Sequence, residues 1–323
     1  MIYQRAEAIP LLNKLYAEKI PFVCFTDFLA EKAWIKPTDE IQADELRYQF
    51  PNQPATPGTS GFKNDFSFDK KPVSYANFKV AFDEVVHQLK IGNSYLTNLT
   101  FRTPVTTNLT LDEIFAQSQA LYRIRYKNDF VVFSPETFVR IEKDKIYSYP
   151  MKGTIDASVP NAKDIIMEDH KEMSEHITIV DLIRNDLSQI ASKVNVTKFR
   201  FISEIQTTYK KLLQVSSEIV GTLQNPRDLG NNLFSLLPAG SISGAPKNQT
   251  LEIIHNAEKE SRNFFTGICG HFDGNTFDSG VMIRFIENKD GKLYFRSGGG
   301  ITALSDPEKE YQEMIDKVYV QVS

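Results

Sequence analysis

Cysteine is scarce in this sequence, and its scarcity excludes whole classes of protein. The 323 residues include only Cys24 and Cys269, and there is no Cys-x-x-Cys pair. A scaffold held by disulfides and a cysteine zinc site are therefore excluded. The five histidines show no metal-ligand spacing, so a histidine metal centre is not expected either.

Excess positive charge and long apolar runs are also lacking. Lys and Arg number 37 against 41 Asp and Glu, a formal net charge of −4, which offers no basic surface for nucleic acid or an anionic membrane. No apolar run approaches membrane-spanning length. Charges throughout residues 1–15 exclude a secretory signal. We expect a cytoplasmic protein with no nucleic-acid and no membrane partner.

Common phosphate-binding and nucleophile motifs are missing as well. The small-residue loop 238–247 fails the P-loop pattern, because Lys247 does not directly follow the second glycine and no Ser or Thr comes next. The run Gly298 to Gly300 fails the dinucleotide fingerprint, and there is no G-x-S-x-G or catalytic-cysteine context. Backbone amides of the loop 238–247 could still bind an anion such as a carboxylate.

What is present is an ordinary globular composition, with 41% hydrophobic and 24% charged residues. Strand and helix patterns alternate without βαβ regularity, which predicts an α+β architecture of antiparallel sheets flanked by helices. The expected helices are 74–92, 111–121, 162–191, 229–237, 247–257 and one that begins at Asp306-Pro307. The expected strands are 22–25, 94–102, 130–133, 137–142, 145–149, 212–223, 264–272, 277–286 and 293–297. The polar, proline-containing stretch 38–71 is typical of a long mobile loop.

Lys152 follows two strand-like runs and a proline, which places it at the mouth of a sheet. A lysine there can be a nucleophile if its neutral amine is available. The ordinary alternative is a strand-end lysine that extends to water.

Two more charged groupings invite a chemical interpretation. Glu310, Glu313 and Lys317 share one helix face; this is either a solvated face or a pair of carboxylates for a hard cation such as Mg²⁺, with Glu175 as a third ligand. Arg284, within the apolar run 281–286, needs a partner, which can be a carboxylate of a ligand or of the protein.

Several of these motifs occur together in a specific order, which resembles the chorismate-utilising enzyme family over roughly residues 74–320. That family includes anthranilate, aminodeoxychorismate, isochorismate and salicylate synthases. The motifs are Ser134-Pro135-Glu136, Pro150-Met151-Lys152-Gly153-Thr154, Glu175-His176 with Asp181 to Leu187, the loop Ser241 to Lys247, and Asp306 to Glu313.

One position separates the branches of this family. Aminodeoxychorismate synthases carry lysine where this sequence has Lys152, whereas the other synthases carry alanine. Water-activating members carry a lysine where this sequence has Leu96, and leucine cannot act as a base. The resemblance therefore favours aminodeoxychorismate synthase component I. Alternatives are anthranilate synthase component I and an inactive regulatory homologue; retention of Glu136, Lys152 and the three candidate metal carboxylates disfavours the second.

The resemblance implies a mechanism and a set of roles. Glu136 would protonate the departing C4 hydroxyl of chorismate, Lys152 would attack C2, and ammonia would then enter at C4 and expel the lysine. The product would be 4-amino-4-deoxychorismate, on the route to folate. Mg²⁺ is expected at Glu175, Glu310 and Glu313, and substrate carboxylates at Arg284, Lys317 and backbone groups of Gly244, Ala245, Gly299 and Gly300.

Further expectations concern partners and organisation. No glutaminase motif is present, so a separate glutamine amidotransferase subunit is the expected source of ammonia. Residues 1–72 are expected to form a short N-terminal segment and residues 73–323 the chorismate-binding catalytic domain. The sequence departs from the family at Gln214, where a histidine is usual, and at Phe265 and Phe285, where tyrosine and threonine are usual. A nucleophilic Lys152 should have a pKa below that of free lysine.

Overall fold

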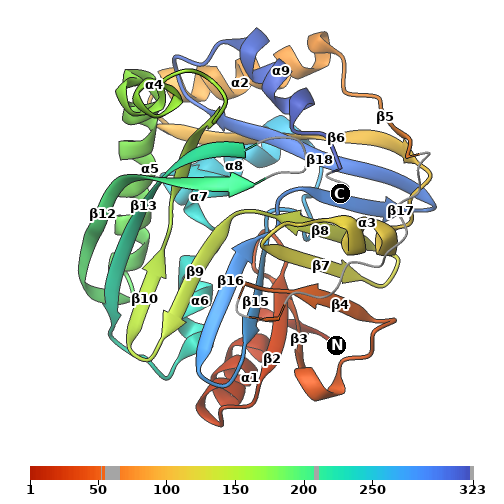
Figure 1. The fold of residues 1–323 in the computed structure, drawn as a ribbon, viewed down its shortest axis with the longest axis vertical. Helices are drawn as coiled ribbons and strands as arrows, with labels where there is room; N and C mark the ends of the chain where they lie inside the picture. The colour runs from red at the N-terminus through yellow and green to blue at the C-terminus, as the bar shows by residue number, and fades with distance from the viewer. Residues whose placement is uncertain (52, 55–65, 207–210, 321–323) are drawn as a thin grey trace.

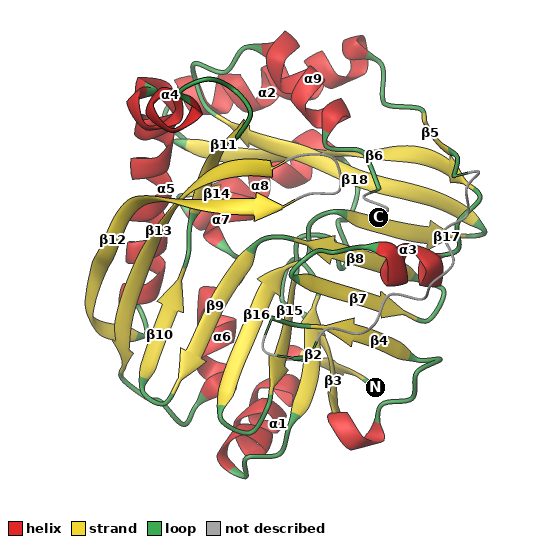
Figure 2. Cartoon of the chain, viewed as in Figure 1, coloured by secondary structure: helices red, strands yellow, loops and turns green. Residues whose placement is uncertain are grey.

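Two antiparallel sheets lie face to face and carry helices on their outer sides (Figures 1 and 2). The computed structural model describes residues 1–323 except 52, 55–65, 207–210 and 321–323. The predicted α+β architecture is confirmed. In the part of the chain that is described, no helix is long and apolar enough to cross a membrane.

Among the described residues, the first sheet has ten strands. In spatial order they are β1 (Ile2–Gln4), β3 (Lys32–Pro37), β2 (Phe22–Thr26), β15 (Ile268–Phe272), β16 (Thr276–Val281), β9 (Thr137–Glu142), β10 (Lys145–Ser148), β13 (Lys211–Leu223) and β11 (Met151–Asp156), with β12 (Ala191–Gln206) also paired to β13.

The second sheet has eight strands in the part of the chain that the structure describes. In spatial order they are β14 (Gly244–Ala245), β6 (Leu96–Thr107), β18 (Lys292–Ile301), β17 (Phe285–Lys289), β8 (Phe130–Ser134), β7 (Tyr122–Tyr126) and β4 (Leu46–Gln49), with β5 (Phe68–Lys70) also paired to β6.

The helices cover the outer faces of both sheets. Helices α1 (Arg5–Ala17), α5 (His170–Ser188) and α6 (Leu229–Leu236) pack on the first sheet. Helices α2 (Tyr75–Lys90), α8 (Lys247–Glu258) and α9 (Pro307–Asp316) pack beside β6 and β18, and α3 (Leu111–Gln117) packs on β7 and β8. The shorter helices are η1 (Thr38–Glu40), α4 (Ala162–Glu168) and α7 (Gly240–Ser243).

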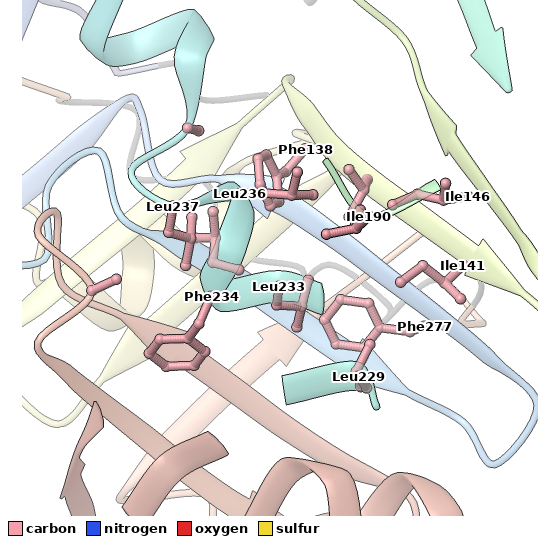
Figure 3. Packing of buried hydrophobic residues seen from close by; sticks show 14 of the residues in the cluster. Phe138, Ile141, Ile146, Ile190, Leu229, Leu233, Phe234, Leu236, Leu237 and Phe277 are labelled. Atoms are coloured by element: carbon pink, nitrogen blue, oxygen red, sulfur yellow. The ribbon is translucent and has the colours of Figure 1, made fainter. Parts of the chain in front are cut away.

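Apolar side chains fill the space on each side of the sheets. Figure 3 shows Phe138, Ile141, Ile146 and Phe277 of the first sheet facing Leu233 and its neighbours on α6. Between the sheets the core is aromatic, and the Phe25 ring stacks on Trp34 at 5.2 Å. Each such buried side chain contributes about 1.5–3 kcal/mol, so the sheets hold a rigid frame for the groups between them.

Local sequence explains where several helices begin and end. Ser74 accepts a hydrogen bond from the backbone N–H of Asn77 at the start of α2, and the helix ends just before Gly92, whose φ of +85° suits glycine. Asp306 caps α9, with Pro307 in the first turn, as predicted.

The predicted helix 162–191 is wrong in extent. The structure divides it into α4 and α5, because Asp169 leaves the helical conformation and accepts the N–H of Glu172 to cap α5. The helix ends at Ser188, and β12, which begins at Ala191, was not predicted from the sequence. Three register shifts between β12 and β13 interrupt the alternation that would have revealed this strand.

The expected loop 38–71 is also partly wrong. It contains η1, β4 and β5, and β4 pairs with β7 while burying Leu46. The prediction of a loop over 55–65 lies outside the described residues. Strands β1 to β3 join the first sheet through β15 and β4 joins the second, so residues 1–72 extend both sheets.

Candidate active site

The chain crosses between the two sheets at two neighbouring points, and a charged residue lies at each. Pro135-Glu136 separates β8 of the second sheet from β9 of the first. Residues 282–284 separate β16 of the first sheet from β17 of the second. The crossings are hydrogen-bonded together: the N–H of Val281 donates to the Glu136 carbonyl at 3.0 Å, and that of Phe133 donates to the Arg284 carbonyl at 3.1 Å.

The sequence predicted a continuous strand over 277–286, and this prediction is wrong at Arg284. Its φ of +53° breaks the strand and turns the chain into the other sheet. A non-glycine residue in this region costs roughly 1–3 kcal/mol and is held only by its surroundings. The Arg284 Nε is buried and has no hydrogen-bond partner among the described residues, while the guanidinium lies 5.6 Å from the Tyr319 ring.

A cavity of about 790 Å³ opens beside these crossings, a size suited to a small organic ligand. Its lining includes most of the charged residues singled out in the sequence: Glu136, Lys152, Glu175, Arg284, Glu313 and Lys317, together with Gly299 and Gly300. Residues more than 180 positions apart in the chain thus face one space.

Lys152 is the second residue of β11, which begins directly after Pro150. Its ammonium Nζ is 2.7 Å from Glu175 Oε2, and both side chains are partly exposed. Burial lowers the pKa of Lys152, but the hydrogen bond and charge of Glu175, with the charges of Glu172 and Glu313, outweigh it and raise the pKa above 10.5. The expectation of a lowered lysine pKa is therefore wrong for this state: Lys152 is an ammonium ion held by carboxylates.

Glu136 has the opposite environment. Burial raises its pKa above the usual 4.5, against the lowering effects of a hydrogen bond from Ser241 and the charges of Arg284 and Lys317. The Ser241 Oγ donates to Glu136 Oε1 at 2.8 Å. A carboxyl group with a raised pKa keeps its proton more readily, which is what a general acid requires.

Glycines 298–300 form one wall of the cavity. The sequence predicted that the strand ends before these glycines, but they continue β18 in register with β6. A Cβ on Gly298 would lie 2.0 Å from the Leu99 carbonyl oxygen. Lys317 donates to the Gly298 carbonyl at 2.9 Å and pairs with Glu313 at 2.6 Å. A Cβ on Gly299 would be 3.5 Å from a Glu310 oxygen and 3.6 Å from a Glu313 oxygen, so both carboxylates converge above this glycine.

Gly244 and Ala245 lie beside residues that line the cavity, and their predicted role in binding a substrate carboxylate stays a prediction. They form β14, which pairs with Thr97 and Leu96 of β6, and neither is among the residues that line the cavity. A Cβ on Gly244 would lie 1.8 Å from the Leu96 carbonyl oxygen, so the glycine permits this strand contact. Their backbone therefore serves the sheet, and the part of that loop that reaches the cavity is Ser241 and Ile242.

Comparison with known proteins agrees with this arrangement. The family model for chorismate binding enzymes matches residues 13–323. The chain belongs to the chorismate-binding enzyme family. An uncharacterized PabA-like protein of Pasteurella multocida (strain Pm70) is 48% identical over 96% of this chain and 97% of its own. Another, from Haemophilus influenzae (strain ATCC 51907 / DSM 11121 / KW20 / Rd), is 44% identical over 96% and 95%.

A solved structure supports the family assignment. Anthranilate synthase component I from Streptococcus pneumoniae TIGR4 matches with a TM-score of 0.66 and 26% identity, over 77% of this chain and 58% of that one. The resemblance to chorismate-utilising enzymes is thereby confirmed.

Chorismate-utilising enzymes of this fold generally depend on Mg²⁺, and the carboxylate oxygens here are of the kind that Mg²⁺ prefers. Burial and the neighbouring charge of Glu313 raise the pKa of Glu310, and a cation between two such carboxylates would relieve their repulsion. Among the described residues, however, no three acidic, His or Cys side chains form a ready metal cluster. Glu175 and Glu313 instead pair with Lys152 and Lys317, so ammonium groups neutralise the carboxylates in this state.

Two residues that interact with candidate site residues were missed in the sequence. Ser241 belongs to the motif Ser241 to Lys247, but only the fold brings it to Glu136. The charge of Glu172 raises the pKa of Lys152 from the same helix as Glu175. Glu172 and Glu175 are three residues apart, as Glu310 and Glu313 are, and this spacing could have identified Glu172 in the sequence.

The three departures from the family pattern have different consequences. Gln214 and Phe265 line the cavity, whereas Phe285 is buried and its ring stacks on Phe130 at 4.9 Å. Only the first two can influence a ligand directly. Leu96 also lines the cavity, so the position that carries a basic lysine in water-activating members is apolar here.

Proposed function

We propose that this enzyme is an aminodeoxychorismate synthase component I, which converts chorismate and ammonia to 4-amino-4-deoxychorismate. The observation that carries the proposal is the presence of Lys152 in the wall of the cavity that Glu136 and Arg284 also line. An amine, an acid with a raised pKa and a guanidinium whose buried Nε has no hydrogen-bond partner among the described residues form the set that this reaction needs.

Chorismate carries two carboxylates, and the cavity offers cations for both. Arg284 presents a planar guanidinium that suits a bidentate carboxylate. Lys317 lies on the glycine wall of the same cavity. Mg²⁺ held by Glu175, Glu310 and Glu313 would add positive charge for a substrate carboxylate. These groups would fix the ring between the acid and the amine, which lowers the entropic part of the barrier.

The chemical steps can be assigned to residues of this chain. Lys152 must first lose its proton, and Glu175 at 2.7 Å is the adjacent acceptor. The amine then bonds to C2 of chorismate, both ring double bonds shift by one position (C1=C2 to C6=C1 and C5=C6 to C4=C5), and the C4 hydroxyl leaves as water with the proton of Glu136. Ammonia next bonds to C4, both double bonds shift back, the bond from Lys152 to C2 breaks, and a proton returns to Glu136.

We also propose that ammonia comes from a separate glutamine amidotransferase subunit. Its support is the absence of a glutaminase motif from the sequence, together with the expectation drawn from the family. Anthranilate synthase component I is the second candidate; the solved S. pneumoniae protein with that name favours it, and Lys152 disfavours it.

The decisive experiment is product analysis by liquid chromatography and mass spectrometry. Purified protein is incubated with chorismate, MgCl₂ and ammonium. Aminodeoxychorismate as the main product supports the proposal. Anthranilate, isochorismate, or unchanged chorismate would each refute it.

A further inference from the structure

Glu258 and Arg262 form a buried ion pair behind the cavity wall. Both side chains are 1% exposed, and two hydrogen bonds join them, from Arg262 Nη2 to Glu258 Oε1 at 2.6 Å and from Nε to Oε2 at 2.9 Å. Glu258 ends α8, and Arg262 follows four residues later. Neither residue lines the cavity, so neither is placed to touch the substrate.

The pair binds β6 at two residues that do line the cavity. Glu258 Oε1 accepts hydrogen bonds from the backbone N–H and the hydroxyl of Thr100, at 2.8 and 2.9 Å. Arg262 Nη2 also donates to the Asn98 carbonyl at 2.8 Å. Asn98 and Thr100 are two positions apart and point to the same side of the strand, so the ion pair fixes this wall of the cavity.

Arg262 also reaches the segment that supports the acid. Its Nη1 donates to the Ile242 carbonyl of α7 at 3.0 Å and to the Thr266 hydroxyl at 3.3 Å. The neighbour of Ile242 in α7 is Ser241, which donates to Glu136. A continuous series of contacts therefore runs from Arg262 through α7 to the carboxyl group of Glu136.

Stability alone is a weak reason for this arrangement. The free energy needed to remove two charges from water is about as large as the free energy gained from their attraction. Replacing such a pair by apolar residues of similar volume therefore often leaves the stability of the protein unchanged. What an apolar pair cannot do is hold three chain segments at fixed distances. The planar fork of Arg262 donates to β6, α7 and Glu258 at once, a geometry that a lysine cannot reproduce.

We infer that the Glu258–Arg262 pair is a positioning device that holds α7 and β6 so that Ser241 keeps the Glu136 carboxyl in place for proton transfer. The inference rests on the proposed function, in which Glu136 is the general acid. The groups that face Glu136 are Ser241, Arg284 and Lys317. Only Ser241 among them belongs to a segment that Arg262 binds.

The test is a double-mutant cycle that measures chorismate consumption, with Arg262→Lys, Ser241→Ala and the double variant. Each single change should lower kcat roughly 10- to 100-fold, the range that a misplacement of about 1 Å causes. KM for chorismate should change little, because the carboxylate-binding groups remain. If Arg262 acts through Ser241, the double variant should stay within about twofold of the slower single variant instead of multiplying the losses.

The pH profile gives a readout that a merely structural residue would not move. The adduct-forming step needs protonated Glu136 and neutral Lys152, and the pKa of Lys152 is the higher of the two, so the acidic limb of the kcat profile follows the pKa of Glu136. The hydrogen bond from Ser241 lowers that pKa. Removing or misplacing it should raise the pKa, and the acidic limb of kcat should shift to higher pH in both single variants.

Arg125→Lys is the matched control. Arg125 is also buried, donates to the backbone carbonyls of Ala43 and Asp44, pairs with Asp112, and does not line the cavity. This change should leave kcat and its pH profile unaltered, and combining it with Ser241→Ala should give the kcat of Ser241→Ala alone.

The outcomes separate the two hypotheses. A kcat within about twofold of wild type for Arg262→Lys, an unshifted acidic limb, or multiplying losses in the double variant would each overturn the inference alone. No chorismate consumption by the wild-type protein would overturn the proposed function as well. If Arg262→Lys does not fold, as judged by circular dichroism, Glu258→Gln replaces it under the same criteria, because glutamine keeps the shape and removes the charge.

Discussion

Replacing Lys152 by alanine separates a covalent role from a purely electrostatic one. If Lys152 is the nucleophile, chorismate without ammonia should leave an adduct on the wild-type protein, with the mass of chorismate less one water. Lys152→Ala should form no adduct and still bind chorismate, because Arg284 and Lys317 remain in the cavity. Lys152→Arg should also fail, since a guanidinium stays protonated and cannot attack.

The structure lets the size of each effect be worked out. Lys152 and Glu175 are 34% and 26% exposed in their side chains, so their ion pair resembles a surface pair worth at most about 1 kcal/mol. The alanine variant should therefore fold, with a melting temperature lowered by only about 2–4 °C. Loss of a covalent nucleophile, in contrast, should reduce kcat by at least roughly a thousandfold.

The raised pKa of Lys152 adds a pH criterion with a definite sign. Glu175 and its acidic neighbours keep the amine protonated, so the neutral, reactive fraction increases as pH rises towards that pKa. Below the pKa, this fraction grows about tenfold for each pH unit. At pH values below the pKa of Glu136, where its proton is in place, adduct formation in rapid-quench samples should accelerate accordingly; above that pKa the loss of the Glu136 proton offsets the gain.

The assay is intact-mass spectrometry followed by peptide mapping to the segment that contains Lys152. Wild-type protein boiled before chorismate is added serves as the control for chemical labelling. If Lys152→Ala made aminodeoxychorismate at the wild-type rate, the covalent step would be refuted. Ammonia would then attack C4 directly, and Lys152 would be only a positioning charge.

Three further predictions can be tested with the same preparation. Chelation should abolish turnover and Mg²⁺ should restore it, with Glu313→Gln imitating partial chelation; full activity after exhaustive dialysis against chelator would contradict the metal assignment. The pure chain should use ammonium but not glutamine, as measured by product formation with each, and glutamine-dependent activity would show the reasoning about the partner to be mistaken. Glu136→Gln should lower kcat by about 100- to 10,000-fold with little change in substrate KM, since the amide keeps the size but loses the proton; an unchanged kcat would remove Glu136 as the acid.

The alternation of strand and helix patterns predicted the α+β fold, and eight of the residues singled out in the sequence line the cavity. Three of these residues were found from local patterns. Lys152 comes shortly after a strand that ends in a proline, Glu136 follows a Ser-Pro dipeptide that ends a strand, and Lys317 lies on the charged face of the last helix. Such signals are short-range, so sequence patterns carry them well.

The features that the sequence did not reveal depend on contacts between distant segments. Arg284 lies in an apolar run that is typical of a strand, and only the need to change sheets turns it into a left-handed residue. The pKa of Lys152 depends on carboxylates from two helices, α5 and α9, whose approach no local pattern records. The hydrogen bond between Ser241 and Glu136 joins residues 105 positions apart.

The position of the acid and the guanidinium follows from how the chain connects the sheets. Where a strand leaves one sheet for the other, its backbone gives up ladder partners, and its side chains face the space between the sheets. Here the two crossings satisfy each other, because Val281 donates to Glu136 and Phe133 donates to Arg284. The acid and the carboxylate-binding arginine are thereby fixed relative to each other by backbone hydrogen bonds, which side-chain substitutions leave intact. Variation in activity among related chains should therefore arise from the groups around this fixed pair, such as Lys152, Leu96 and Gln214, which line the same cavity.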